Sequence, residues 1–469
     1  MPHFDKNEEH TPDLVHQYEE MVRTNSIGFF EKGAFEKIID YYEYHHDLDE
    51  ALKVLEFALS QHPYSSLFYI RKAQLHVEYN KPSEAIAALD IAEIYDAMDL
   101  EIYLLRAEAL SLLGKRNESL VILNQCINRF DQVEHDEIYL CMAGIYEDLE
   151  SFDESFNALR SALLANPKSK PALDRMWLTV ELSGLYKESV KLHEEILDLD
   201  PYSYLAWYNL GHAYISLGNH EKAVESFEFA MVINEKFEFA YRDCGEALRK
   251  LGLFERAIEV YLDAIENVRQ DAEFYTSLGV CYEELNQFWK AKEFYHKAIK
   301  FDPHSDIAYF RLGCVLGKEN FWLKAITVLH KALAINPQNS DYVTALADAY
   351  VETEEYQKAA EMYRDAADMA PDESAKWVQY AAFLLQLDVA EMALEILEEA
   401  TVYCDGADLD YCMAACRLNL GMRRSGLDCL HSALYKDYEL HTILFQIDPD
   451  LEYDADVLAG IALYLPEAD

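Results

Sequence analysis

Apolar and polar residues follow each other along this chain with the period of an amphipathic helix, in segments of about 12 to 14 residues. A short polar link separates each segment from the next, so the segments come in pairs. Glycine and proline are sparse, with 16 and 12 copies among 469 residues, which argues against a loop-rich or all-β chain. The pattern therefore predicts an all-α protein built from pairs of short helices.

The helical pattern repeats with a period of 34 residues. The segment WYNLGHAYISLGNHEKAVESFEFAMVIN, residues 207 to 234, has counterparts that begin at Tyr275 and Tyr309. One position of the repeat is occupied by a small residue throughout the chain: Ala51, Ala85, Ser119, Ser155, Ser189, Ala223, Ala257, Ala291, Ala325, Ala359, Ala393 and Gly426. Successive members of this column of small residues are 34 residues apart, except for one step of 36 after Ser119 and one of 33 after Ala393.

Two further columns of small residues accompany the first one. One lies seven residues further on, and the other, usually Gly or Ala, lies near residue 8 of each unit. Small residues recur where two helices cross closely, because a longer side chain would force the helix axes apart. Half of the prolines fall at the ends of units, where a helix must stop: Pro63, Pro167, Pro201, Pro303, Pro337 and Pro371.

This pattern resembles the tetratricopeptide repeat (TPR), a 34-residue helix–turn–helix whose motif is W-x2-L-G-x2-Y followed by Ala, Phe, Ala and Pro. Trp207, Leu210, Gly211 and Tyr214 carry the first part of that motif here. The resemblance covers residues 32 to 440. It implies an all-α, right-handed superhelical solenoid of about twelve stacked TPR helix pairs, with a concave inner groove.

The ends of the chain differ from the repeats, so we divide the chain into three parts. Residues 1–31 are predicted to hold a polar segment and a capping helix, residues 32–440 the TPR solenoid, and residues 441–469 an acidic capping helix or tail. From Asp437 onward there are nine acidic residues and no Lys or Arg. This last segment either covers the apolar face of the final repeat or docks a partner, and both alternatives stay open.

Repeat 5 departs from the pattern at two positions. Trp177 replaces the usual Gly or Ala, and Ile196 replaces Ala. Bulky residues where helices cross closely are expected to splay this helix pair or to shift its neighbour, and to change the superhelical curvature between about residues 170 and 203. Compensation by smaller neighbouring residues is the alternative.

Composition restricts the possible partners and compartments. The chain has 86 acidic and 40 basic residues, a formal net charge of −46 that repels nucleic-acid backbones and anionic membranes. Its start has no signal-peptide h-region, no stretch approaches the roughly 18 apolar residues of a membrane span, and the nine cysteines are widely spaced. These features predict a cytoplasmic protein without membrane insertion or a nucleic-acid partner; the oligomeric state stays open.

The sequence contains no motif for catalysis or for a cofactor. P-loop, G-x-S-x-G, H-E-x-x-H and G-x-G-x-x-G patterns are all missing. Cys412 and Cys416 are expected to be buried small residues, and the adjacent His45 and His46 to lie on a solvated face. The alternating carboxylates after Asp448 lack the Gly and the final Glu of a calcium loop. We therefore predict no catalytic residue, no metal and no cofactor.

The resemblance also implies which residues line the groove, because in TPR proteins the first helix of each pair faces it. No unit carries the Lys–Asn pair with which the best-known TPR site clamps a peptide carboxylate. A basic group in repeats 7 and 9 could hold an acidic segment or a chain terminus: Arg242, Arg249, Lys250, Arg311 and Lys318. The rest of the inferred lining interleaves carboxylates with apolar and aromatic residues: Glu108, Glu147, Asp148, Glu181, Glu246, Glu283, Glu284, Asp348, Glu352, Leu104, Leu140, Tyr208, Phe239 and Phe310.

The leading hypothesis is a non-enzymatic scaffold or adaptor that binds basic or amphipathic protein segments in this groove. The alternatives are a chaperone-like holdase for basic clients, and a regulatory subunit of an enzyme complex or an enzyme with an unrecognised site. Repeats 6 to 9 match the family best, so the predicted peptide-binding residues concentrate there: Tyr208, His212, Phe239, Arg242, Glu246, Arg249, Thr276, Glu283, Phe310, Arg311 and Asp348.

Overall fold

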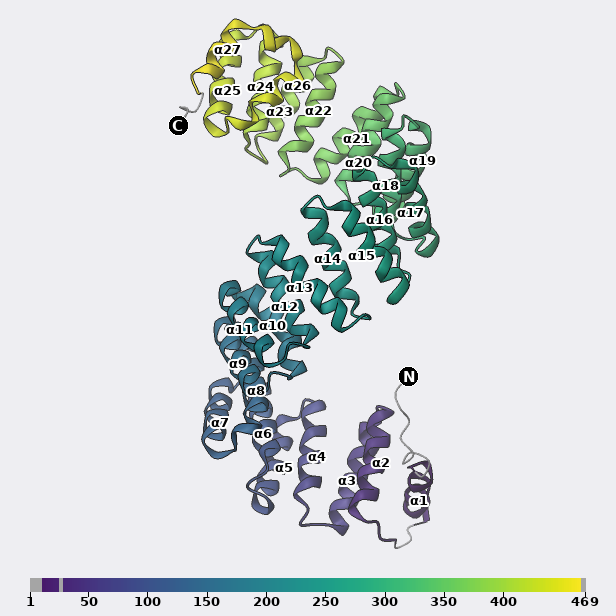
Figure 1. The fold of residues 1–469 in the computed structure, drawn as a ribbon, viewed down its shortest axis with the longest axis vertical. Helices are drawn as coiled ribbons and strands as arrows, with labels where there is room; N and C mark the ends of the chain where they lie inside the picture. The colour runs from purple at the N-terminus through teal and green to yellow at the C-terminus, as the bar shows by residue number, and fades with distance from the viewer. Residues whose placement is uncertain (1–10, 25–27, 465–469) are drawn as a thin grey trace. The chain divides into compact units, whose positions relative to one another are not determined.

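The computed structural model describes residues 11–24 and 28–464, and within these ranges every regular element is helical (Figure 1). The chain forms two compact units, Met1–Ala240 and Tyr241–Asp469. After α1 (Thr11–Thr24), the helices of both units follow one another as twelve pairs of similar length. The predicted fold class, an all-α solenoid of stacked helix–turn–helix repeats, is confirmed.

The first unit contains six complete pairs: α2 (Lys32–Tyr44) with α3 (Leu48–Gln61), α4 (Ser66–Glu78) with α5 (Pro82–Tyr95), α6 (Leu100–Leu112) with α7 (Arg116–Arg129), α8 (His135–Asp148) with α9 (Phe152–Ala165), α10 (Lys170–Ser183) with α11 (Tyr186–Leu199), and α12 (Tyr204–Ser216) with α13 (His220–Ile233). Within this unit each second helix also packs on the first helix of the following pair. The pairs of this unit therefore stack on one another in chain order.

The division between the units falls within α14 (Glu238–Lys250), which precedes α15 (Phe254–Asn267). Five further pairs belong wholly to the second unit: α16 (Ala272–Glu284) with α17 (Phe288–Phe301), α18 (Asp306–Lys318) with α19 (Trp322–Ile335), α20 (Ser340–Glu352) with α21 (Tyr356–Met369), α22 (Ser374–Gln386) with α23 (Ala390–Ala400), and α24 (Ala407–Asn419) with α25 (Arg423–Lys436).

Each pair turns at one residue in the left-handed conformation. The backbone angle φ is positive at one position between the two helices of all twelve pairs, and glycine occupies five of these positions. The other seven positions hold His46, Asn80, Glu150, Asn286, Asn320, Glu354 and Asp388. The left-handed region costs little energy only for Gly, and among the other residues Asn tolerates it best. The turn nevertheless keeps this conformation in all twelve pairs, so it is a fixed feature of the repeat.

Inside a pair, a small residue of the first helix faces a large residue of the second. A Cβ atom added to Gly279 would lie 2.4 Å from the Tyr295 ring, and one added to Gly211 would lie 2.4 Å from the Phe227 ring. Both rings are fully buried. The close helix crossings predicted from the small-residue columns are thus present, and glycine is required because no side chain fits there.

The fifth pair is splayed, as its sequence predicts. Helices α10 and α11 share few contacts, whereas the helices of the neighbouring pairs pack along their length, and α10 packs on α12 instead. Trp177 occupies the position of Gly211 one repeat earlier and is 46% exposed, so it does not enter the pair. Ile196 is fully buried. The predicted change of curvature stays a prediction.

Additional helices lie at the two ends of the repeat array. Helix α1 buries Val15, Tyr18 and Met21 in a core shared with α2 and α3. The polar segment predicted before it lies outside the described residues, apart from Thr11. After α25 come η3 (Glu439–His441), α26 (Thr442–Ile447), η4 (Pro449–Tyr453) and α27 (Ala455–Ala462).

These last elements pack on the final pair, with α26 against α24 and α27 against α25. Leu444 and Val457 are fully buried, and Arg423 donates to the carboxylates of Asp454 and Asp456 at 2.7 Å. The segment therefore covers apolar surface of the final pair. The three-part division of the chain itself stays a prediction.

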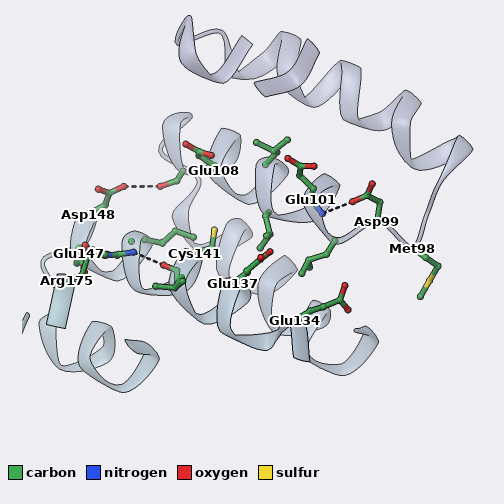
Figure 2. Close-up of a pocket in the computed structure, with 17 residues that line it drawn as sticks. Met98, Asp99, Glu101, Glu108, Glu134, Glu137, Cys141, Glu147, Asp148 and Arg175 are labelled. Atoms are coloured by element: carbon green, nitrogen blue, oxygen red, sulfur yellow. Dashed lines mark hydrogen bonds and ion pairs between the residues drawn. The ribbon is translucent and has the colours of Figure 1, made fainter. Parts of the chain in front are cut away.

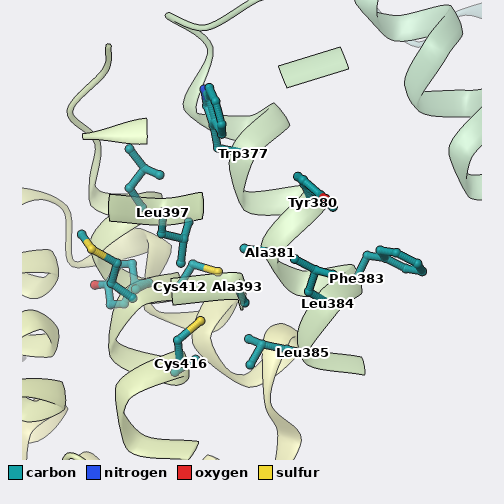
Figure 3. Close-up of a cluster of buried hydrophobic side chains, with 14 of the residues drawn as sticks. Trp377, Tyr380, Ala381, Phe383, Leu384, Leu385, Ala393, Leu397, Cys412 and Cys416 are labelled. Atoms are coloured by element: carbon teal, nitrogen blue, oxygen red, sulfur yellow. The ribbon is translucent and has the colours of Figure 1, made fainter. Parts of the chain in front are cut away.

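The core of the second unit is rich in aromatic and small residues around α22 to α25 (Figure 3). Cys412 and Cys416 lie in it, fully buried on α24, as predicted from their spacing. The hydrogen bond with Cys416, together with burial, holds the pKa of Cys412 well above its usual range. All nine cysteines are free thiols.

Candidate functional site

A cavity of about 1050 Å³ lies between α6 and α8, the first helices of the third and fourth pairs (Figure 2). Its walls come from one face of each helix and from the link before each helix. On α6 these are positions such as Leu104, Glu108 and Ser111, and on α8 positions such as Glu137 and Cys141. Residues three or four apart lie on one face of a helix, so the named residues of α6 form one face and those of α8 another. Both of these faces line the same cavity.

The cavity has an apolar floor with an acidic rim. Leu104, Leu105, Leu140 and Ile145 supply most of the floor, and Gly144 leaves room beside them. A Cβ atom at Gly144 would meet only the end of Arg175, at 3.4 Å, so the glycine widens the cavity rather than allowing a close helix crossing. Seven carboxylates surround this floor: Asp99, Glu101, Glu108, Glu134, Glu137, Glu147 and Asp148.

Arg175 is the single guanidinium in the wall and neutralises only one end of the cavity. It donates to the Glu147 carboxylate at 2.8 Å and to the backbone carbonyl of Leu140 at 3.1 Å. Glu108, Glu134 and Glu137 have no cation within ion-pair distance among the residues that the structure describes. The other end of the cavity therefore carries uncompensated negative charge beside apolar surface.

The walls of the cavity change the proton affinity of its acidic groups. Partial desolvation, followed by the nearby Glu78, raises the pKa of Glu108. Partial desolvation and the neighbouring Asp99 raise the pKa of Glu101. Burial, followed by the charge of Glu108, raises the pKa of Cys141 to about 12, so Cys141 is a neutral thiol at physiological pH. Chemically the cavity is rich in carboxylates, and its cysteine is not an activated nucleophile.

The irregular 36-residue step in the sequence falls at this cavity. Between α7 and α8 the chain forms the 3-10 turn η2 (Gln132–Glu134), and α8 is one residue longer than α6. This step places Glu134 in the rim. Glu108, Glu147, Asp148, Leu104 and Leu140 belong to the lining inferred from the sequence; Asp99, Glu101, Glu134 and Glu137 were missed there, and the 36-residue step was the available signal.

In the first unit the predicted binding residues Tyr208 and His212 lie together in an aromatic cluster. Their ring centroids are 4.5 Å apart, and Tyr208 lies 4.9 Å from Phe237. Phe237 in turn lies 5.7 Å from Phe239, whose side chain is largely exposed. Ring contacts with Phe237 thus connect these three predicted residues, which lie in and just after the sixth pair.

In the second unit three of the five basic residues predicted for the groove have ion-pair partners among the described residues. Arg242 pairs with Glu273 at 2.9 Å, and Arg249 pairs with Glu246 at 2.5 Å. Lys318 pairs with Glu283, as described below. An acidic ligand would have to compete with these carboxylates for the cations.

Other predicted residues of the second unit also belong to internal networks. Glu283 is buried and accepts hydrogen bonds from Tyr295 and Lys318, both at 2.8 Å. Phe310 stacks on Tyr342 with ring centroids 4.6 Å apart. The remaining three lie on first helices: Thr276 donates to the Ala272 carbonyl, Asp348 accepts from Tyr363, and Arg311 is half-buried on α18.

Comparison with known proteins adds the family. Models described as "Tetratricopeptide repeat" match residues 204–237 and 272–305, and also residues 44–109 and 322–377. The chain therefore contains tetratricopeptide repeats. The matched TPR segments cover less than half of the chain and lie in both units, and one of them ends within helix α6 of the acidic cavity.

A curated relative named "Peroxisomal targeting signal receptor", from Candida glabrata, is 25% identical over 109 residues, or 23% of this chain. The chain spans only 18% of the length of that relative. Two solved structures are similar in fold: yeast Tom70, at 15% identity, covering 92% of this chain and 98% of that one with a TM-score of 0.43, and the Cut9–Hcn1 assembly, at 13% identity, covering 87% and 99% with a TM-score of 0.39. At these TM-scores the likeness adds nothing to the TPR assignment.

Within residues 11–24 and 28–464, no helix is both long enough and apolar enough to cross a membrane.

Proposed function

We propose that this TPR protein is a non-enzymatic interaction scaffold or adaptor, and that its acidic cavity binds a basic, amphipathic segment of a partner protein. One observation carries the proposal: seven carboxylates and one guanidinium surround an apolar floor on the first helices of two adjacent repeats. An apolar side chain of the partner would fill the floor, and Lys or Arg residues beside it would pair with Glu108, Glu134 and Glu137.

The position of the cavity supports this proposal. It lies on first helices, the face that TPR resemblance implies for the groove, and the curated relative carries the name of a targeting signal receptor. The free thiols are consistent with the proposed cytoplasmic location. Absence of enzymatic activity is part of the proposal, supported by the raised pKa of Cys141 and by carboxylates that face a wide open cavity.

Fluorescence anisotropy with a labelled 20-residue peptide tests the proposal. The peptide carries Lys and Arg on one helical face and Leu on the other, and its control carries Glu in place of every Lys and Arg. We expect the basic peptide to bind and the affinity to fall as salt rises, because screening weakens exposed charge pairs. We expect the double variant Glu108→Gln, Glu137→Gln to lower the affinity by about tenfold.

A matched control uses two exposed carboxylates on second helices of the same unit. Glu154→Gln with Glu221→Gln removes the same charge without touching the cavity. Equal loss of affinity in both double variants would show that only net charge matters, and would contradict a specific site. Full affinity in the Glu108, Glu137 variant would place the binding elsewhere, and the predicted residues in repeats 6 to 9 would then be the next candidates.

A further inference from the structure

The second unit carries a surface whose charge is opposite to that of the rest of the chain. Helix α17 contains four lysines and one acidic residue, Glu293, and helix α19 contains two lysines and no acidic residue. These are the second helices of the eighth and ninth pairs, and they belong to a protein with a formal net charge of −46. The net negative charge already favours solubility, so a local excess of lysines suggests a binding role for this surface.

Between these helices lies an apolar cavity of about 600 Å³. Leu312 and Leu316, from α18, form its floor, and Val328 and Trp289 form its sides. The Trp289 side chain is 63% exposed, although it is the largest apolar group at the rim. Lys292 and Lys324 also line the cavity, so cations and apolar surface adjoin each other.

Two lysines retain charge for a ligand: Lys324, which lines the cavity, and Lys290, which lies beside Trp289. Lys290 lies over the rings of Tyr282 and Trp289, at 4.7 and 5.5 Å from the centroids, and Lys324 lies 5.1 Å from the Phe321 centroid. Among the described residues neither lysine has a carboxylate within ion-pair distance. Aromatic rings hold an ammonium group in place without neutralising it. Lys292, in contrast, is paired with Glu319.

We propose that this outer surface of α17 to α19 is a second docking site, for an acidic amphipathic segment of a separate partner protein. A bulky apolar side chain of that segment would enter the cavity beside Trp289. Carboxylates that flank it in the segment would pair with Lys290 and Lys324. The charge of this partner is opposite to that of the partner proposed for the cavity on α6 and α8, so the two sites select different segments.

Charge and packing argue against the other occupants. The acidic segment after α25 packs on α24 and α25, and its Asp454 and Asp456 pair with Arg423. Two copies of a chain with net charge −46 repel each other. A nucleic-acid strand meets the same repulsion from the net charge of the chain.

The test uses the full chain and a labelled 18-residue helical peptide with Glu on one face and Leu and Phe on the other. We expect this peptide to bind, and Trp289→Ala and Lys324→Glu each to weaken binding by about tenfold. Arg424→Glu is the matched control, because Arg424 is an exposed cation of the same unit on α25. We expect it to bind as the original chain does.

Several outcomes would overturn the proposal. These are unchanged affinity in both Trp289→Ala and Lys324→Glu, equal loss in Arg424→Glu, displacement of the peptide by a single-stranded DNA 20-mer, or self-association of the chain that Lys324→Glu abolishes. The Glu108→Gln, Glu137→Gln variant should bind the acidic peptide normally. This result separates a failure at this surface from a failure of the proposed function.

Discussion

The fifth and eighth helix pairs use the same two positions in opposite ways. In the eighth pair Gly279 faces the buried ring of Tyr295, whose hydroxyl donates to Glu283 at 2.8 Å. In the fifth pair Trp177 and His193 occupy these positions. Trp177 turns outward and its two helices share few contacts, so one exchange of small for large opens a pair that is otherwise closed.

The open pair leaves space where the closed pair leaves none. Trp177 lines two cavities, of about 340 and 220 Å³, on the two sides of α10. Its partner position keeps a fully buried imidazole, and the Nε2 atom of His193 has no hydrogen-bond partner among the described residues. Departures from the repeat pattern therefore reduce the packing between helices and create concave surface. The 36-residue step at the acidic cavity is another such departure.

The largest expected effect comes from placing a methyl group in the closed pair. Gly279→Ala should destabilise the second unit by about 2 to 3 kcal/mol, because the new Cβ atom would lie 2.4 Å from the Tyr295 ring. Hydrogen exchange of α16 and α17 and the thermal midpoint measure this effect.

Gly144→Ala is the control for that substitution. Its Cβ atom would meet only Arg175, at 3.4 Å, and the helix would gain about 0.5 to 1 kcal/mol from losing a glycine. The same substitution should thus have opposite signs at the two sites. If both variants changed stability in the same direction, close packing would not be the reason for glycine at residue 279.

An intermediate effect is expected at the buried imidazole of the open pair. His193→Leu should change the stability of the first unit by no more than about 1 kcal/mol at neutral pH, since it removes the unpartnered Nε2 atom together with the hydrogen bonds between Nδ1 and Ser189. Thermal unfolding followed by circular dichroism measures the change.

The stability of the His193→Leu variant relative to the original chain should rise as the pH falls. Burial lowers the pKa of His193 to about 4, from the value of 6.5 that applies in the unfolded chain. Between these pH values the unfolded chain binds a proton that the folded chain does not bind, so the original chain loses stability on acidification. His304→Leu, at an exposed turn residue, should leave that pH dependence unchanged; an unaltered slope in His193→Leu would contradict the assignment.

The smallest expected effect concerns the acidic cavity. Glu108→Gln should raise the thermal midpoint slightly at neutral pH while it weakens binding of the basic peptide. The pKa of Glu108 is raised in the folded chain, so its ionised form lowers stability once the pH rises above that pKa, and glutamine avoids this loss. Glu154→Gln should change neither property, and a lower midpoint in Glu108→Gln would indicate a structural role for the carboxylate.

The sequence was sufficient to predict the repeat architecture, because its small-residue columns report directly on helix crossings. Ala51, Ala85 and their successors, together with the prolines at unit ends, define twelve pairs that the structure contains. The same reasoning located the open fifth pair from Trp177 and Ile196. These features depend on local spacing, which a linear pattern records well.

The candidate site was harder to predict, since it depends on contacts between repeats. Ranking the most regular repeats first favoured residues such as Glu283 and Arg242, which the fold engages in internal hydrogen bonds and ion pairs. The large acidic cavity lies instead beside the irregular 36-residue step. The left-handed turns at Glu150 and Glu354 were also missed, because no glycine marks them in the sequence.

The left-handed turn residues also have a consequence for how such a chain can change length. Asn286 and Asn320 have the same backbone conformation, 34 residues apart, and each is followed by the start of a second helix. Deletion of the segment that follows Asn286 and ends at Asn320 would remove one complete repeat unit, or cassette. The backbone conformation at the new junction would be the same as before, so the next helix would start in the same direction. Duplication or loss of a cassette between two such points is therefore a small step in evolution, and an equally simple operation for an engineer.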